Sequence, residues 1–114
     1  MVYLSFLFER VTNMDLKYFE EHICEELEGA RDYIMRAIEL KGMDKRWADI
    51  FYKMSLEEVG HAKQLFALYE EYVKILSDNL VRRPEYISES METMIDTYSA
   101  SLSEITIMQN IYKE

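Results

Sequence analysis

The stretch EEVGHAKQ, from Glu57 to Gln64, interrupts an apolar helical pattern with a carboxylate and an imidazole. The pattern runs in alternating steps of four and three through Trp47, Phe51, Met54, Glu58, His61, Leu65, Leu68 and Tyr72. This spacing predicts the inward face of a helix in a bundle. Glu57 competes with Glu58 as the partner of His61, but the stripe through Glu57 continues to Gln64 and the stripe through Glu58 continues to Leu65. The pattern therefore favours Glu58 and His61 as the inward pair.

The preceding segment carries a second stripe of the same kind. It consists of Leu16, Phe19, Ile23, Glu26, Ala30, Tyr33, Ala37 and Leu40. Glu25 and Glu28 lie about 100° and about 200° around the helix from this stripe, because each residue turns the chain by about 100°. Glu26 is therefore expected to face the core together with Tyr33, while Glu25 and Glu28 face outward.

Breaks between these segments are few, because the chain has 3 glycines and 1 proline. KGMD, from Lys41 to Asp44, offers Gly42 as a helix stop and Asp44 as the N-cap of the next helix. SDNLVRRPE, from Ser77 to Glu85, places Pro84 in the first turn of a third helix. We predict an all-α domain spanning residues 1–114, with helices near 14–41, 44–77 and 84–112. The first two should form an antiparallel hairpin over 14–77.

The third predicted helix has its own stripe of Ile87, Met91, Met94, Tyr98, Leu102, Ile105 and Tyr112. Because the hairpin leaves residues 84–112 without an assigned role, this stripe is a reason to expect that dimers of the chain assemble further.

Composition excludes several classes of function. The 114-residue chain has a net charge of −9, which argues against nucleic acid and anionic membranes as partners. Cys24 is the single cysteine, so an intrachain disulfide and a four-cysteine metal module are excluded. The opening MVYLSFLFERV has neither a basic start nor a small-residue cleavage site, and we expect no signal peptide. No stretch approaches the length of a membrane span, so a cytoplasmic protein is expected.

Carboxylates on inward faces need a reason, because a buried unpaired carboxylate is costly. Metal binding supplies one, since carboxylate oxygens with an imidazole suit iron or manganese. His61 alone is better explained as a hydrogen-bonded core histidine, but Glu26, Tyr33, Glu58 and His61 on matched stripes favour ligation. Di-iron helical bundles use a Glu from each of two helices and Glu-x-x-His from each of two others. One chain supplies half of that set, and a homodimer related by a two-fold axis would supply it all.

The segments EELEGARDY and EEVGHA resemble the ferritin-like superfamily over roughly residues 14–76. The shared pattern is a first-helix Glu26, Tyr33 seven residues later, and Glu58 with His61 on the second helix. The length and the half-site most resemble the encapsulated ferritins, whose two-helix chains dimerise into a four-helix bundle with a ferroxidase centre.

The resemblance implies roles for particular residues. Glu26, Glu58 and His61 would ligate iron, and Tyr33 would complete the catalytic set from outside the ligands. Glu25 and Glu28 would help iron to enter, although a solvated acidic face is the better explanation for them. His22 could bind a peripheral cation with Glu26, but an exposed histidine is the simpler interpretation.

The resemblance also implies an activity and partners. The activity would be oxidation of Fe(II) to Fe(III) for iron storage or detoxification, in a homodimer or a higher oligomer of dimers. An encapsulin shell stays open as a partner and compartment, because the chain ends in MQNIYKE instead of a Gly-, Ser- and Leu-rich cargo peptide. A rubrerythrin-like peroxidase or oxidase, a manganese protein and a metal-free helical interaction module are the alternatives. The resemblance explains neither the apolar N-terminal segment nor the third helix.

Overall fold

The computed structural model describes the backbone of residues 2–78 and 85–114, and the side chains of residues 15–78 and 85–114. The described chain folds into three helices: α1 (Val2–Leu40), α2 (Lys45–Asp78) and α3 (Glu85–Lys113). There is no strand within the described residues, and the predicted all-α class is confirmed. The role predicted for Pro84 lies outside the described residues.

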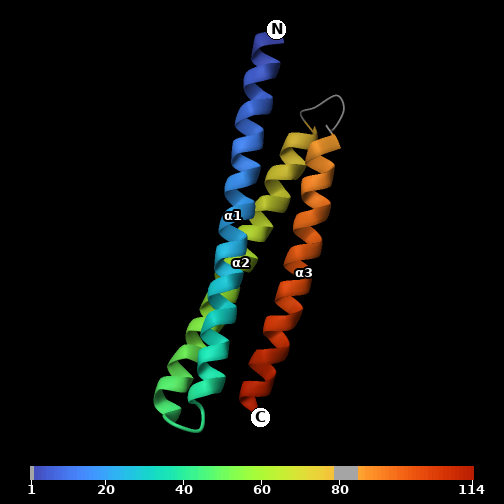
Figure 1. Cartoon of the computed structure of the whole chain (residues 1–114). Helices are drawn as coiled ribbons and strands as arrows, with labels where there is room; N and C mark the ends of the chain where they lie inside the picture. Colours follow the sequence, from blue (N-terminus) through green and yellow to red (C-terminus); the bar gives the residue numbers. More distant parts are fainter. Residues whose placement is uncertain (1, 79–84) are drawn as a thin grey trace.

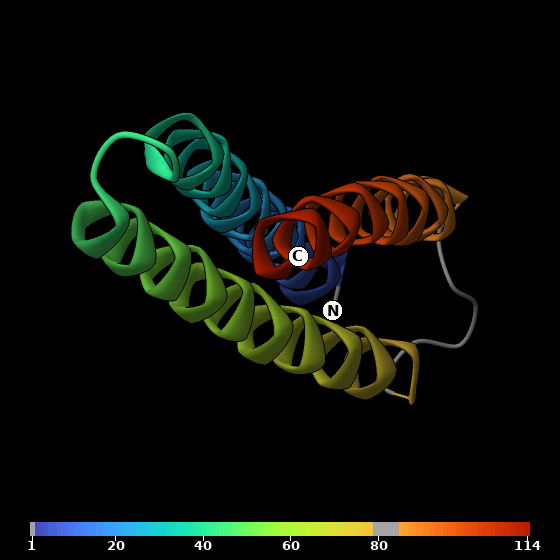
Figure 2. The ribbon, with the colours of Figure 1, turned by 90° about the horizontal axis from the view of Figure 1, so that it is seen from below.

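α1 and α2 form the predicted antiparallel hairpin, and α3 runs in the same direction as α1 (Figure 1). Seen along the long axis of the molecule, the three helices stand at the corners of a triangle (Figure 2). α1 packs along most of α2 and less extensively on α3, while α2 and α3 make few contacts with each other. α1 is therefore the central element of the fold.

The turn between α1 and α2 follows the predicted capping. Trp47 N donates a hydrogen bond to Asp44 Oδ1 at 3.2 Å, so Asp44 caps α2 as expected. Met43 N and Asp44 N both donate to Leu40 O, at 2.9 and 2.8 Å. Gly42 lies just beyond the end of α1, but no described glycine has a positive φ. The helix therefore stops there without a left-handed glycine.

The start of α1 corrects the predicted boundary. We expected the helix to begin near residue 14, and it begins at Val2. Residues 2–13 contain neither glycine nor proline, so nothing in the backbone chemistry ends the helix before the chain does.

Two apolar clusters hold the helices together. The larger contains Ile23, Leu27, Val59, Tyr69 and Ile105, and it draws on all three helices. The smaller lies towards the α1–α2 turn and contains Ile34, Ala37, Ala48 and Tyr112. All of the predicted α3 stripe is buried in these clusters or packed against them, so the stripe faces the hairpin of its own chain.

The end of α3 is tied to the hairpin by polar contacts. The Tyr112 hydroxyl donates to Asp49 of α2, and Lys41 Nζ donates to the Tyr112 carbonyl oxygen. Burial and the adjacent Asp49 raise the pKa of Tyr112 to about 12. The bundle is long and thin, with Cα extents of 64 × 18 × 16 Å. Within the described residues, no helix contains a stretch both long and apolar enough to cross a lipid bilayer.

Candidate metal centre

Glu26 of α1 and Glu58 and His61 of α2 lie together on one side of the hairpin. One ligand atom from each side chain can be chosen so that all three lie within 4.8 Å of one another. His61 Nδ1 is 3.4 Å from Glu26 Oε2 and 3.9 Å from Glu58 Oε1. Glu26, Glu58 and His61 form the only such group of acidic, histidine or cysteine side chains in the described part of the chain. The structure thus brings together the three residues that the sequence singled out as metal ligands.

Gly29 of α1 lies against the Glu58 side chain of the centre. A Cβ built on Gly29 would lie 3.4 Å from Glu58 Oε2 and 3.7 Å from both Cγ and Cδ of the same side chain. The Glu58 carboxylate therefore rests against the backbone of α1, close to Glu26. Gly60, the other mid-helix glycine, has open space around its missing Cβ. Of the two, only Gly29 is tied to the site by a close approach.

The Glu26 and Glu58 carboxylates repel each other when both are ionised. A hydrogen bond with Glu26, then burial, then the charge of Glu26 raise the pKa of Glu58 to about 7, and the nearby His61 opposes this rise. Oε2 of Glu26 is shielded from solvent and makes no hydrogen bond of ordinary geometry, although His61 Nδ1 lies 3.4 Å away. A shielded acceptor beside a second carboxylate is a place where a cation lowers the energy. The residues present therefore fit a metal ion.

The centre opens onto the surface. The side chains of Glu26 and Glu58 are each 27% exposed, and that of His61 is 56% exposed. We expected His61 to lie in the buried face of α2, together with Trp47 and Leu68. Within the single chain this prediction is wrong for all three residues, since Trp47 and Leu68 are 53% and 52% exposed.

The buried face of α2 lies beside the predicted one. It consists of Ala48, Ser55, Val59, Ala62, Tyr69, Val73 and Leu76. The larger apolar cluster, to which α1, α2 and α3 all contribute, gathers on this side of α2. Side chains on the predicted stripe are consequently left at the edge of the core or outside it.

Tyr33 does not join the three ligands. Its ring packs beside Phe51, with ring centroids 6.1 Å apart. Phe51 in turn packs against the smaller apolar cluster near the α1–α2 turn. Within the single chain Tyr33 is a packing residue, and its predicted catalytic role stays a prediction.

The peripheral acidic residues spread over other faces. His22 Nδ1 lies 3.5 Å from Glu25 Oε2, and the His22 ring sits 4.2 Å from the ring of Tyr18. His22 therefore pairs with Glu25 rather than with Glu26. Glu28 is exposed. The pKa of Cys24 is raised, first by burial and then by the nearby negative charge of Glu28. Glu57 is exposed and lies outside the group of three.

Sequence reasoning missed a polar chain behind the centre. Ser55 Oγ donates to the carbonyl oxygen of Ala30 at 2.7 Å, and Gln109 Nε2 donates to Ser55 Oγ at 3.0 Å. These two hydrogen bonds join all three helices, one turn of α2 away from Glu58. Ser55 and Gln109 are the only buried polar residues among the described side chains. The signal in the sequence was a serine and a glutamine at positions where the buried faces of α2 and α3 otherwise carry mostly apolar residues.

Glu26, Glu58 and His61 offer carboxylate oxygens and an imidazole nitrogen on adjacent helices, which is a donor set that suits iron or manganese. In kind, the three side chains match half of the ligand set that di-iron helical bundles use. Comparison with models of protein families, with curated proteins and with solved structures finds no match to this chain.

Proposed function

We propose that this protein oxidises ferrous iron at a site that two copies of the chain build together. The observation that carries the proposal is the convergence of Glu26, Glu58 and His61 within 4.8 Å. Motif likeness to the ferritin-like superfamily supports it, through the same residues.

The choice of iron follows from the donor atoms. Carboxylate oxygens and a histidine nitrogen are ligands for both iron and manganese. Two negative charges held close together favour the more highly charged ferric ion over the ferrous ion. Ferrous iron would therefore bind as the substrate, with oxygen or peroxide as the oxidant.

The chain's own residues contribute a proton as well as ligands. Glu58 has a pKa of about 7 because it lies against Glu26, so a fraction of the molecules carries a proton there at neutral pH. A divalent ion displaces that proton, since it stabilises the ionised carboxylate. Iron binding should therefore release protons.

A second copy is inferred from the surface around the centre. Trp47, Ile50 and Leu68 lie 14, 11 and 7 residues from His61, which are spacings that return to the same side of a helix. Each is more than half exposed, at 53%, 52% and 52%. A second hairpin on this open face, defined by Trp47, Ile50, His61 and Leu68, would cover these side chains. Its own Glu26, Glu58 and His61 would then complete the set of ligands.

Anaerobic calorimetric titration with ferrous iron tests the ligands. Wild type should bind one ion per chain and release protons on binding. The double variant Glu58→Ala, His61→Ala should lose this binding, while Glu57→Ala, which removes a neighbouring exposed carboxylate, should keep it. Equal binding by wild type and the double variant would sink the assignment.

Aerobic mixing tests the oxidation. The growth of ferric absorbance should exceed that of buffer alone, and Glu26→Ala should remove the excess. Turnover beyond one iron per chain supports a ferroxidase, whereas oxidation that stops there indicates a retained redox centre of the peroxidase kind. If iron-loaded protein shows no excess with oxygen or with hydrogen peroxide, the proposed activity is wrong.

A further inference from the structure

A cavity lies between α1 and α3, away from the metal centre. It has a volume of about 400 Å³, and its lining includes Glu20 and Cys24 of α1 and Ser90, Met94 and Thr97 of α3. Cys24 and Glu26 are two residues apart, so they point to nearly opposite sides of α1. A second chain on the open face would leave this cavity uncovered.

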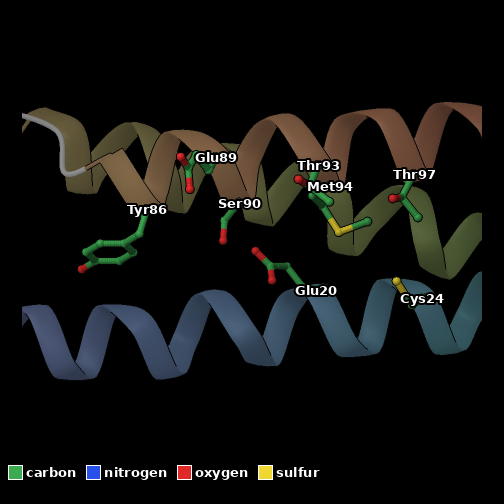
Figure 3. Close-up of a pocket in the computed structure, with 8 residues that line it drawn as sticks. All are labelled: Glu20, Cys24, Tyr86, Glu89, Ser90, Thr93, Met94 and Thr97. Atoms are coloured by element: carbon green, nitrogen blue, oxygen red, sulfur yellow. The ribbon is translucent and has the colours of Figure 1, made fainter.

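Glu20 gives the cavity its charge. Figure 3 shows its carboxylate reaching from α1 towards Ser90 of α3. Oε1 of Glu20 is shielded from solvent and makes no hydrogen bond of ordinary geometry. Burial raises the pKa of Glu20, although the nearby hydroxyls of Ser90 and Tyr69 lower it. The hydroxyl of Tyr69, a residue only 1% exposed, also makes no hydrogen bond of ordinary geometry.

Among the described residues, no positively charged side chain balances this charge. None of the described residues that line the cavity is lysine, arginine or histidine, and the lining includes a second carboxylate, Glu89. Of the ion pairs found among residues 15–78 and 85–114, none involves Glu20. A partly buried carboxylate without a counter-ion favours a positively charged occupant.

The size and chemistry of the lining point to an organic cation rather than a metal ion. The volume falls in the range of small-molecule sites. A metal ion needs several converging ligands, and the only described group of three that converges is Glu26, Glu58 and His61. The lining instead combines one inward carboxylate with hydroxyl acceptors such as Ser90 and Thr97 (Figure 3).

Apolar and aromatic groups complete the lining. The Met94 side chain extends into the space between α1 and α3, and the Tyr86 ring lies at one end of it (Figure 3). Such groups suit the carbon chain of an amine, and an aromatic face attracts a cation. An anion would be repelled by Glu20, and a neutral ligand would leave its partly buried carboxylate without a counter-ion.

We propose that the cavity between α1 and α3 binds a small organic ammonium ion, with the Glu20 carboxylate as its counter-ion and the hydroxyls of α3 as acceptors for its N–H groups. This site is independent of the proposed iron chemistry.

Calorimetry on the full chain with three probes of one carbon length tests the proposal. Hexylammonium should bind saturably, 1-hexanol should bind at least about tenfold more weakly, and hexanoate should bind more weakly still. Glu20→Gln should weaken hexylammonium binding by at least about tenfold and leave 1-hexanol unchanged. Glu21→Gln, an exposed neighbour paired with Lys17, is the matched control and should behave as wild type.

Amide chemical shifts on hexylammonium binding should change around Glu20, Ser90 and Thr97. Thr97→Leu, which fills the cavity without changing its charge, should weaken both hexylammonium and 1-hexanol. Hexylammonium should bind the Glu58→Ala, His61→Ala variant as it binds wild type, so failure of the iron proposal leaves this one standing.

Three outcomes would overturn the inference. One is equal affinity for hexylammonium and 1-hexanol, and another is unchanged affinity in Glu20→Gln. The third is the absence of saturable hexylammonium binding below about 10 mM.

Discussion

Glu26 and Glu58 hold two carboxylates side by side, and this should make the stability of the metal-free protein depend on pH. The pKa of Glu58 rises from 4.5 to about 7 on folding. A raised folded-state pKa contributes stability that is fully present below about pH 4.5 and is lost as the pH rises through about 7. The free energy of unfolding should therefore fall over this range.

Glu58→Gln removes the charge but keeps a hydrogen-bonding side chain, so it should flatten this fall. Urea unfolding at about pH 5 and about pH 8 measures the difference. Glu57→Gln, one residue away and exposed, removes only the smallest contribution to the raised pKa of Glu58 and should keep most of the wild-type fall. A Glu58→Gln protein that loses as much stability as wild type between the two pH values would contradict the prediction.

The two mid-helix glycines should respond differently to alanine. Gly60→Ala meets no atom within 4 Å, so it should stabilise the protein by up to about 1 kcal/mol through helix propensity. Gly29→Ala places its Cβ in van der Waals contact with the Glu58 carboxylate, 3.4 Å from Oε2, so it should restrict that carboxylate and weaken iron binding. Urea unfolding and ferrous titration compare the pair. Identical behaviour of the two variants in both measurements would show that the close approach of Gly29 has no role.

Among the helices, one buried polar link between α3 and the hairpin runs through Ser55 and Gln109. Gln109→Leu removes the donor to Ser55 Oγ and should cost about 1 kcal/mol. Ser55→Ala leaves the buried Gln109 amide without its partner and should cost about 1–3 kcal/mol. Because the two residues share one hydrogen bond, the double variant should cost less than the sum of the single variants. Unfolding experiments on all four proteins give this coupling.

Asn110→Ala is the control for this cycle. Asn110 is exposed beside Gln109, and its replacement should change the free energy of unfolding by less than about 0.5 kcal/mol. Strict additivity of the Ser55 and Gln109 variants would mean that the hydrogen bond contributes nothing to stability.

The helices themselves were predictable because their signals are local. The Asp44 cap, the break around Gly42 and the period of α3 can be read from neighbouring residues. Glu26, Glu58 and His61 were predictable as a group because each lies at a fixed step along its own helix. Their contact with one another follows from antiparallel packing.

The exposure of His61, the Ser55–Gln109 bond and the α1–α3 cavity could not be predicted in this way. Each depends on where α3 packs, and contacting residues of α3 and the hairpin can be far apart in sequence, as Gln109 and Ser55 are, 54 residues apart. The period of a stripe gives the side of a helix only to within about one residue, or about 100°. The choice between the Trp47–His61–Leu68 face and the Ser55–Val59–Ala62 face was therefore settled by tertiary packing.

For the molecule as a whole, the open face beside the metal centre predicts self-association. Leu68→Lys puts a charge on this face and should convert the proposed dimer into a monomer with the wild-type helix content. Ile107→Lys is the matched control, because Ile107 is 57% exposed on α3 and should leave the dimer intact. Light scattering gives the mass of each protein. A wild-type monomer that still binds iron tightly would refute the shared site.

Trp47 is the only tryptophan in the chain, and its side chain is 53% exposed on the open face. Indole fluorescence shifts to shorter wavelength when water around the ring is replaced by apolar groups. The protein therefore carries one intrinsic optical probe at the surface where a second copy would dock. Its emission on dilution should follow the covering of that surface separately from any event in the α1–α3 cavity, which no tryptophan lines.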